Sequence, residues 1–406
     1  MTEFTGPTVQ SERIQSLDVL RGFAVLGILV MNIQAFSMIG GAYFNPTAYG
    51  DLTGLNYLVW LLSHLLADMK FMGIFSMLFG AGMVLMAERL EATGRRPIRI
   101  HYRRTFILLL FGLAHAWLLW TGDILYSYAM CGFVVFLFRK KTPKTLITLG
   151  IVSITIASVL GIATQFSIPY WTPEDLAEIG KFWAPLQSQV AHEVEAYRGG
   201  WAAQNEVRFL MAAQMQVGSF LFSISWRAGG LMLVGMGLFK LGVFRAALPA
   251  RSYKRMILWA LLLGLPLSGL GVWYHHATGW SLEKGFFGGM QFNYWGSLFT
   301  MMGWVGVVML FCQRWPESRL HRSLASTGQM ALTNYLMQTL ICTTIFYGHG
   351  FGFFGSVERS GQILIVLAVW AVELLWSPWW LARFRFGPFE WLWRSLTYMK
   401  LQPMRR

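Results

Sequence analysis

Asp18, Arg21 and Asn32 place two charges and an amide within the apolar run "RIQSLDVLRGFAVLGILVMN" of residues 13–32. Charged side chains are costly in lipid, so those inside membrane helices usually face the bundle interior or a wet cavity. Asp18 and Arg21 are three residues apart and can pair on one helical face. Asn32 follows Arg21 by eleven residues, about 16 Å further along that face. The spacing predicts either the lining of a passage or a helix capped by Ser16 or Asp18 and anchored by the ion pair.

His115, in "LLLFGLAHAWLLWTGDILYSYAM", is the first candidate for a general base. Imidazole is the side chain best suited to proton transfer near neutral pH. Asp123 follows eight residues later, with Tyr126 and Tyr128 just beyond. The carboxylate can cap the next helix, or it can orient or neutralise cationic partners in the same cavity as His115. A hydrogen-bonded core histidine is the alternative interpretation.

The segment "LNYLVWLLSHLLADMKF" has a polar face that carries His64, Asp68 and Lys70. Such a pattern is typical of a helix lying on the membrane surface. Lys70 and Arg227 lie at the ends of their spans away from most other basic residues. Together with Asp68 and Asp123 they predict a charged vestibule, and snorkelling of single side chains is the alternative. His64 is the second candidate for a general base.

Asn334, Tyr335 and Gln338 form a polar stripe in "GQMALTNYLMQT". Asn334 and Gln338 are spaced i, i+4 and share a helical face. Hydrogen bonding between membrane helices is the simpler interpretation of such a stripe. Glu373 is a carboxylate deep in another apolar run, and the sequence identifies no partner for it.

Long apolar runs must position these residues, and they determine the fold class. The chain has 406 residues, of which 55% are hydrophobic and only 13% are charged, about half the charged fraction of a soluble protein. Runs of about 20 apolar residues, long enough to cross a bilayer, recur throughout. The sequence predicts one integral membrane domain over residues 1–406, an all-α bundle of ten spans, or eleven if 206–225 also crosses. The ten spans are 17–39, 67–87, 104–122, 124–138, 145–168, 226–244, 256–275, 292–313, 324–346 and 361–382.

The distribution of charge predicts the orientation. With both termini in the cytoplasm, 26 of the 33 Lys and Arg residues fall on the cytoplasmic side, as the positive-inside rule requires. Residues 386–406 then form a cytoplasmic C-terminal segment, and 40–66 and 169–225 form external loops with interfacial helices. A crossing at 206–225 would place the basic residues of 240–255 outside. The net charge of +14 therefore reflects topology and contact with anionic membrane lipids, and no nucleic-acid partner is expected.

Motifs of soluble hydrolases and metal sites are absent from the sequence. There is no GxSxG elbow, no GxxxxGK loop and no HExxH motif. Cys131, Cys312 and Cys342 match no metal-ligand spacing. The adjacent His275 and His276 are weak indicators of a metal, so none is expected.

Five blocks of the sequence resemble the YeiB family of bacterial inner-membrane proteins. They are "SLDVLRGFAVLGILVMN", "KFMGIFSMLFGAGM", "GLAHAWLLWTGDILYSYAMCG", "TGQMALTNYLMQTLICTTIFYGHGFGFFG" and "FGPFEWLWRSLTYMK". The resemblance spans nearly the whole chain and implies a multi-pass protein of the bacterial inner membrane. The last block adds Glu390 and Arg394 to the candidate substrate-binding residues.

A wider resemblance connects this family to the transmembrane acyltransferase superfamily, which includes heparan-alpha-glucosaminide N-acetyltransferase. Those proteins are similar in opening with a Leu-Asp-x-x-Arg-Gly first span, and the heparan enzyme has asparagine where this chain has Asn32. The resemblance implies transfer of an acyl group from cytoplasmic acyl-CoA or acetyl-CoA, with no tightly bound cofactor, to a hydroxyl or amine of a glycan or lipid acceptor. The heparan enzyme's essential histidine corresponds to Tyr43 here, so no residue inherits its role.

Three functions are compatible with these residues. In an acyltransferase, Arg21, held by Asp18, would bind the CoA phosphates, and His115 would deprotonate the acceptor. Asn32, Asn334 and Gln338 would polarise the thioester carbonyl. A transporter or flippase would move its substrate through the same passage. A non-catalytic lipid-binding protein would bind lipid without acyl transfer or transport. The sequence leaves open whether the chain acts alone or as a homodimer. The remaining candidates for substrate contact are His64, Asp68, Lys70, Tyr126, Tyr128, Arg227, Tyr335, Glu390 and Arg394.

Overall fold

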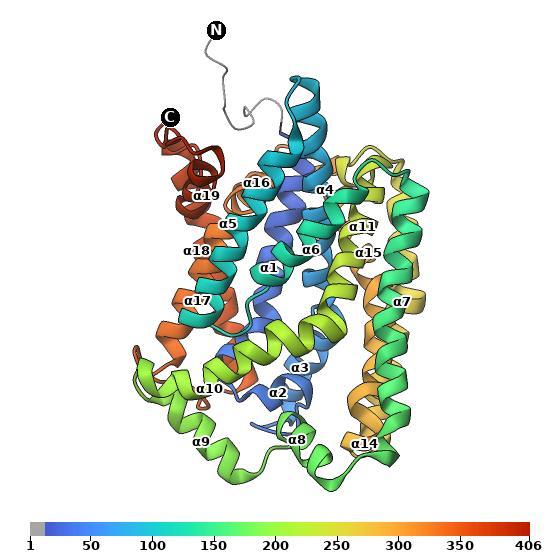
Figure 1. The fold of residues 1–406 in the computed structure, drawn as a ribbon, viewed down its shortest axis with the longest axis vertical. Helices are drawn as coiled ribbons and strands as arrows, with labels where there is room; N and C mark the ends of the chain where they lie inside the picture. Colours follow the sequence, from blue (N-terminus) through green and yellow to red (C-terminus); the bar gives the residue numbers. More distant parts are fainter. Residues whose placement is uncertain (1–12) are drawn as a thin grey trace.

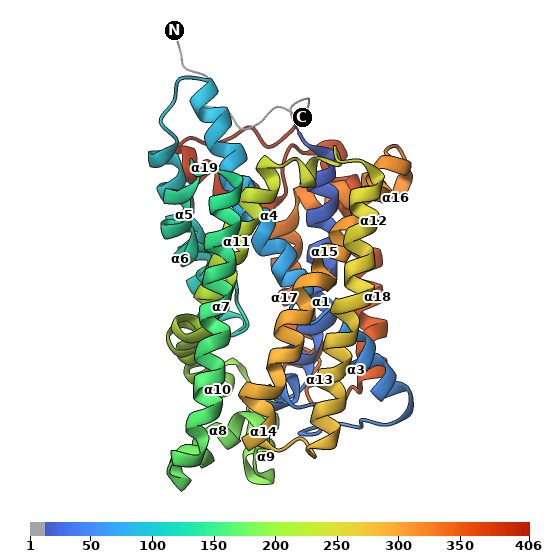
Figure 2. The same ribbon diagram turned by 90° about the vertical axis from the view of Figure 1, so that its right-hand side faces the viewer.

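The computed structural model describes residues 13–406 as a bundle of helices (Figure 1, Figure 2). Within that range the only β-type pairing is an isolated bridge between Phe384 and Arg405. Seven helical stretches are long and apolar enough to cross a membrane. The chain is therefore a helical membrane protein, as the sequence predicts. The seven stretches are Gln15–Ser37, Gly54–Ala92, Pro143–Tyr170, Trp201–Lys240, Ala250–Ala277, Leu282–Arg314 and Arg359–Arg383.

The other three predicted spans correspond to shorter or interrupted helices. The predicted span 104–122 becomes α5 (Pro97–Leu118), which starts earlier because Pro97 occupies the first helical turn. The span 124–138 becomes α6 (Leu125–Val135) and a short 3₁₀ turn. The span 324–346 is divided at Met330 into α16 (Arg319–Gln329) and α17 (Ala331–Phe346).

The two ends of the bundle differ in their elements (Figure 1). One end carries the start of α1, both α16 and α19, and the C-terminus, and we name it the basic end. The opposite end carries α2, α3, α8, α9 and α14, and we name it the loop end. The elements not yet bounded are α1 (Gln15–Ser37), α2 (Gly40–Phe44), α3 (Gly54–Leu66), α4 (Lys70–Ala92), α7 (Pro143–Ser167), α8 (Pro173–Trp183), α9 (Gln187–Arg198), α10 (Trp201–Gln214), α11 (Ser225–Lys240), α12 (Ala250–Trp259), α13 (Leu265–Ala277), α14 (Leu282–Lys284), α15 (Met290–Arg314), α18 (Arg359–Arg383) and α19 (Pro388–Tyr398).

Helix α1 lies inside the bundle and positions the first candidate residues. It packs against α4, α15, α16, α17 and α18, and most of its residues are buried. The long segments 40–66 and 169–225 carry α2, α3 and α8 to α10 at the loop end. Helix α10 continues through a π-helical stretch, Met215–Ile224, directly into α11. Residues 206–225 therefore lead into the next long helix without turning back.

Glu193 on α9 should make the stability of the fold depend on pH. Its Oε1 accepts a hydrogen bond from the Gly40 backbone N–H at 2.9 Å, and burial raises its pKa to about 7. A carboxyl group whose pKa is raised on folding stabilises the fold below its unfolded pKa, and that contribution is lost as the pH rises through the folded value. We expect Glu193→Gln, which keeps the acceptor, to match the wild type near pH 4.5 and to exceed its stability by about 1–3 kcal/mol above pH 7. Thermal unfolding at both pH values measures this difference, and a constant difference would contradict it.

Candidate functional site

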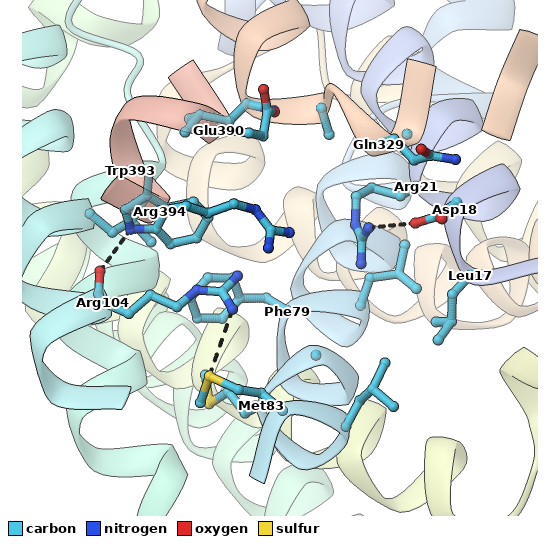
Figure 3. A pocket seen from close by; sticks show the side chains of 18 of the residues that line it. Leu17, Asp18, Arg21, Phe79, Met83, Arg104, Gln329, Glu390, Trp393 and Arg394 are labelled. Atoms are coloured by element: carbon cyan, nitrogen blue, oxygen red, sulfur yellow. Dashed lines mark hydrogen bonds and ion pairs between the residues drawn. The ribbon is translucent and has the colours of Figure 1, made fainter. Parts of the chain in front are cut away.

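A cavity of about 770 Å³ lies at the basic end of the bundle. Its walls come from α1, α4, α5 and α19, and the starts of α6 and α17 close its inner part. Residues that are far apart in the sequence therefore form one site (Figure 3). A cavity of this size is within the usual range for small-molecule sites.

The outer part of the cavity is strongly basic. Six arginines line the cavity, against two carboxylates, among the residues that the structure describes. Figure 3 shows Arg21 pointing from one wall, and Arg104 and Arg394 from the opposite wall, towards the same space. An excess of guanidinium groups favours an anionic ligand, and phosphate suits their geometry. The six arginines are Arg13, Arg21, Arg89, Arg95, Arg104 and Arg394.

Asp18 holds two of these arginines on the α1 wall. Arg13 donates from Nε to Oδ2 at 2.9 Å, and Arg21 donates from Nη1 to Oδ1 at 3.0 Å. The predicted ion pair between Asp18 and Arg21 is therefore confirmed. The predicted side-chain cap is wrong, because the helix start carries no side-chain cap and Ser16 bonds to the Phe244 carbonyl instead.

Aromatic rings support the arginines of the opposite wall. The Arg104 guanidinium lies 4.2 Å from the centre of the Trp393 ring, and Trp393 Nε1 donates to the Arg104 carbonyl at 2.9 Å. Arg394 lies over Phe386 at 4.8 Å. Burial, with the nearby charges of Arg13 and Arg104, lowers the pKa of Arg394 to about 10, so it stays charged at neutral pH. Stacked guanidinium groups lose little further freedom when they bind an anion.

Glu390 fixes the break between α16 and α17. Its carboxylate accepts the backbone N–H groups of Leu332 and Thr333 at 2.7 and 3.1 Å, and the Thr333 hydroxyl at 2.5 Å. These are the unpaired donors of the first turn of α17. Burial raises the pKa of this carboxyl group. Glu390 thus lines the cavity mainly as a helix cap, and Arg394 beside it supplies a cation.

The inner part of the cavity is apolar apart from two tyrosines. Val25, Ile28 and Phe75 contribute to its walls, and Tyr128 and Tyr335 lie among its lining residues. The Tyr128 hydroxyl donates to the Met72 carbonyl at 3.0 Å. The Tyr335 hydroxyl is buried beside the Ile124 backbone and donates to no described residue. Buried polar groups usually have partners, so this hydroxyl is available to a ligand.

His115 lies directly behind Tyr335. The two rings are 5.3 Å apart, and His115 is 2% exposed and does not line the cavity. Its Nδ1 lies 2.8 Å from Asp123 Oδ1, and its Nε2 lies 2.9 Å from the Thr339 hydroxyl. Asp123 also accepts the Tyr126 backbone N–H at 2.8 Å, so it both caps α6 and orients the imidazole. Both ring nitrogens are therefore occupied by the protein.

The remaining amide candidates bond between helices. Asn334 donates to Ser377 at 3.1 Å, and Gln338 donates to Glu373 at 3.0 Å. This identifies a partner for Glu373 and matches the simpler interpretation of the polar stripe. Neither amide lines the cavity. Asn32 is half-buried on α1 and lies one turn beyond Ile28, where the α1 wall of the cavity ends.

A second polar group, separate from the cavity, lies at the loop end. His64, Asp68 and Lys70 meet there, joined by Asn293 of α15, which the sequence does not single out. Arg227 is buried nearby and donates to the Tyr294 carbonyl and the Ser297 hydroxyl. Ten of the sequence candidates therefore divide between two sites, and the others lie in neither. Asp18, Arg21, Tyr128, Tyr335, Glu390 and Arg394 line the cavity, whereas His64, Asp68, Lys70 and Arg227 lie at or near the loop end.

Comparison with known proteins identifies the family. Residues 238–400 match the family described as "Protein of unknown function (DUF418)". The chain is 33% identical to "Uncharacterized protein YxaH" of Bacillus subtilis (strain 168), over 98% of this chain and 97% of the relative. It is 31% identical to "Uncharacterized protein YeiB" of Escherichia coli (strain K12), over 97% of this chain and 98% of the relative. The chain belongs to the YeiB family.

Membership of the YeiB family assigns no reaction by itself, because both relatives are named as uncharacterized. Of the cavity residues, Tyr335, Glu390 and Arg394 lie within the matched range 238–400, whereas Asp18 and Arg21 lie outside it. The cavity of this YeiB-family protein is thus built from both halves of the chain. Its function has to be argued from the site.

Proposed function

We propose that this protein is an acyl-CoA-dependent acyltransferase of the bacterial inner membrane. The observation that carries the proposal is a basic cavity mouth above an apolar interior in which the Tyr335 hydroxyl donates to no described residue. The arginine-rich mouth suits the phosphates of CoA, and the interior suits its acyl end. The resemblance to the transmembrane acyltransferase superfamily supports the same activity.

The proposed orientation places the basic end in the cytoplasm. Both termini then face the cytoplasm, where acyl-CoA is available, and most of the basic residues meet the positive-inside rule. Helix α17 adds an eighth crossing to the seven long stretches, and α5 and α6 form a hairpin that enters the membrane from the basic end. The backbone between α5 and α6 then lies at membrane depth, which is tolerated because it is enclosed by protein.

Each part of the cavity has a proposed role. Arg21, Arg104 and Arg394 bind the CoA phosphates by charge-assisted hydrogen bonds, and Asp18 positions Arg21. The Tyr335 hydroxyl donates a hydrogen bond to the thioester carbonyl as negative charge develops there. His115 and Asp123 support the Tyr335 ring from behind. A general base for the acceptor is not among these groups, because both nitrogens of His115 are occupied.

Hydroxylamine provides a direct test, because it attacks thioesters in its neutral form and needs no general base. We expect the purified protein to accelerate the conversion of acetyl-CoA and hydroxylamine to acetohydroxamate and free CoA. Tyr335→Phe should slow this reaction by about 10²–10³-fold, the usual effect of removing one such donor, and should leave acetyl-CoA binding unchanged. An unaccelerated reaction in a protein that binds acetyl-CoA would contradict the proposal.

The apolar wall below the arginines also suits the tail of an anionic lipid, and this observation favours lipid binding as the second candidate function. A phospholipid that co-purifies in the cavity and is not displaced by acetyl-CoA would support that function over acyl transfer. Mass spectrometry of the purified protein, before and after incubation with acetyl-CoA, distinguishes the two.

A further inference from the structure

A preorganised histidine lies at the loop end, outside the cavity. The chain turns sharply between α3 and α4 at Met69, whose φ of 63° is unusual for a residue other than glycine. Because of this turn, the side chains of the two flanking charged residues, Asp68 and Lys70, both contact the Asn293 side chain of α15. Asn293 donates to Asp68 Oδ2 at 2.7 Å and accepts from Lys70 Nζ at 2.5 Å. Lys70 is completely buried, so the amide is held in one orientation.

Asp68 in turn orients His64. Its Oδ2 lies 3.1 Å from Nδ1 of the imidazole, one helical turn away. The Trp60 ring stacks on the imidazole at 5.6 Å with an angle of 17°. No described residue hydrogen-bonds to Nε2, and 20% of the His64 side chain is exposed. A carboxylate on Nδ1–H leaves the lone pair on Nε2, which is the arrangement of a general base held by a third group.

The two carboxylate-bound histidines differ in access. His115 is 2% exposed and its Nε2 meets the Thr339 hydroxyl. His64 lies 3.1 Å from its carboxylate, its side chain is 20% exposed, and no described residue hydrogen-bonds to its other nitrogen. Of the two, His64 is therefore the histidine that an external molecule can reach more easily.

We propose that the cluster of His64, Asp68, Asn293 and Lys70 is the acceptor site, where His64 deprotonates a hydroxyl or amine that arrives from the loop end. This inference rests on the proposed acyltransferase function. The acceptor proton passes to Nε2 of His64 as the acceptor oxygen or nitrogen bonds to the acyl carbon. The carbon–sulfur bond breaks, and CoA leaves as a thiolate that takes a proton from water at the basic end.

Helix α4 connects the acceptor site to the cavity. Lys70, its first residue, precedes the cavity residue Phe75 by five residues, about 7–8 Å along the helix axis. Phe71 lies between them, packed against Gly27, Phe23 and Trp304. Acyl transfer between the two sites therefore requires the packing around Phe71 to open. The acceptor and CoA would enter from opposite ends of the bundle.

Labelling with diethyl pyrocarbonate tests the open imidazole independently of turnover. We expect mass spectrometry of the intact wild-type protein to find His64 modified at a rate similar to that of the exposed His276, and His115 unmodified. Labelling of His64 no faster than that of His115 would overturn the proposal, whatever the outcome of the acetyl-CoA experiments.

Turnover with a weak nucleophile tests the role of the base. With glycerol and ethanolamine as acceptors, His64→Ala should reduce acetyl transfer by about 10²–10⁴-fold, while the reaction with hydroxylamine stays at the wild-type rate. Added imidazole should restore part of the lost activity in His64→Ala. Equal losses with all three acceptors, without rescue, would indicate a structural role and overturn the proposal. If the wild-type protein did not accelerate the hydroxylamine reaction at all, the proposed function itself would be contradicted.

Discussion

Replacing Arg21 with alanine is expected to weaken acetyl-CoA binding by about 10- to 100-fold. Arg21 reaches from α1 into the space that Arg104 and Arg394 face from the opposite wall. A charge-assisted hydrogen bond contributes about 1.5–3 kcal/mol, which gives this range. Asp18 keeps its contact with Arg13 in the variant, so α1 should remain anchored. Calorimetric titration of the purified protein measures the change.

Arg314 provides a matched control for the effect of charge alone. It is exposed on α15, which ends with its basic residue in the last turn, and it does not line the cavity. Arg314→Ala removes the same charge and should leave the dissociation constant unchanged. The combined replacement of Arg21, Arg104 and Arg394 should abolish binding. Unchanged affinity in that triple variant would exclude the cavity as a CoA site.

The α1 wall could be predicted from sequence because its interactions are local. Asp18 and Arg21 are three residues apart, so helical periodicity alone places them together. The opposite wall could not be predicted in this way. Trp393 and Arg104 are 289 residues apart in the chain, and only the packing of α19 against α5 brings them into contact.

The same distinction holds for the two histidines. The spacing of His64 and Asp68 is i, i+4, which predicts their contact. Asn293, which connects Asp68 to Lys70, lies more than 220 residues away, and no local pattern indicates it. The prediction for His115 placed Asp123 nearby, but as a helix cap or as a partner for cations. It could not foresee that Thr339 would occupy the other nitrogen, because that contact depends on the packing of α17.

Position 43 shows how tertiary structure can relocate a function. The resemblance to the heparan enzyme predicts a histidine there, and the chain has a tyrosine on α2. Burial, and then the negative charge of Asp68, raise the pKa of the Tyr43 phenol. An imidazole is nonetheless present in that neighbourhood, supplied by His64 of α3. This proposal identifies His64 as the base that the resemblance leaves unassigned.

Gly328→Ala is expected to disrupt the contact between α1 and α16 that positions Asp18 and Arg21. An added Cβ at Gly328 would lie 1.8 Å from the Asp18 carbonyl oxygen, and one at Gly22 would lie 2.0 Å from the Leu324 carbonyl oxygen. Backbone atoms cannot rotate away as a flexible side chain could, so the helices must separate. Overpacking of this kind costs about 1–3 kcal/mol and occasionally more. We expect a lower unfolding temperature and weaker acetyl-CoA binding together, because Arg21 moves with α1.

The same glycine-to-alanine substitution at Gly269 should change the unfolding temperature in the opposite direction. Gly269 lies inside α13, and an added Cβ would meet no heavy atom within 4 Å. Alanine is favoured over glycine in a helix interior by about 0.5–1 kcal/mol, so Gly269→Ala should unfold at the same or a higher temperature. Thermal unfolding of both variants in one detergent compares them directly. If Gly328→Ala matched Gly269→Ala in stability and in acetyl-CoA affinity, the close approach of α1 and α16 could not be what positions Arg21.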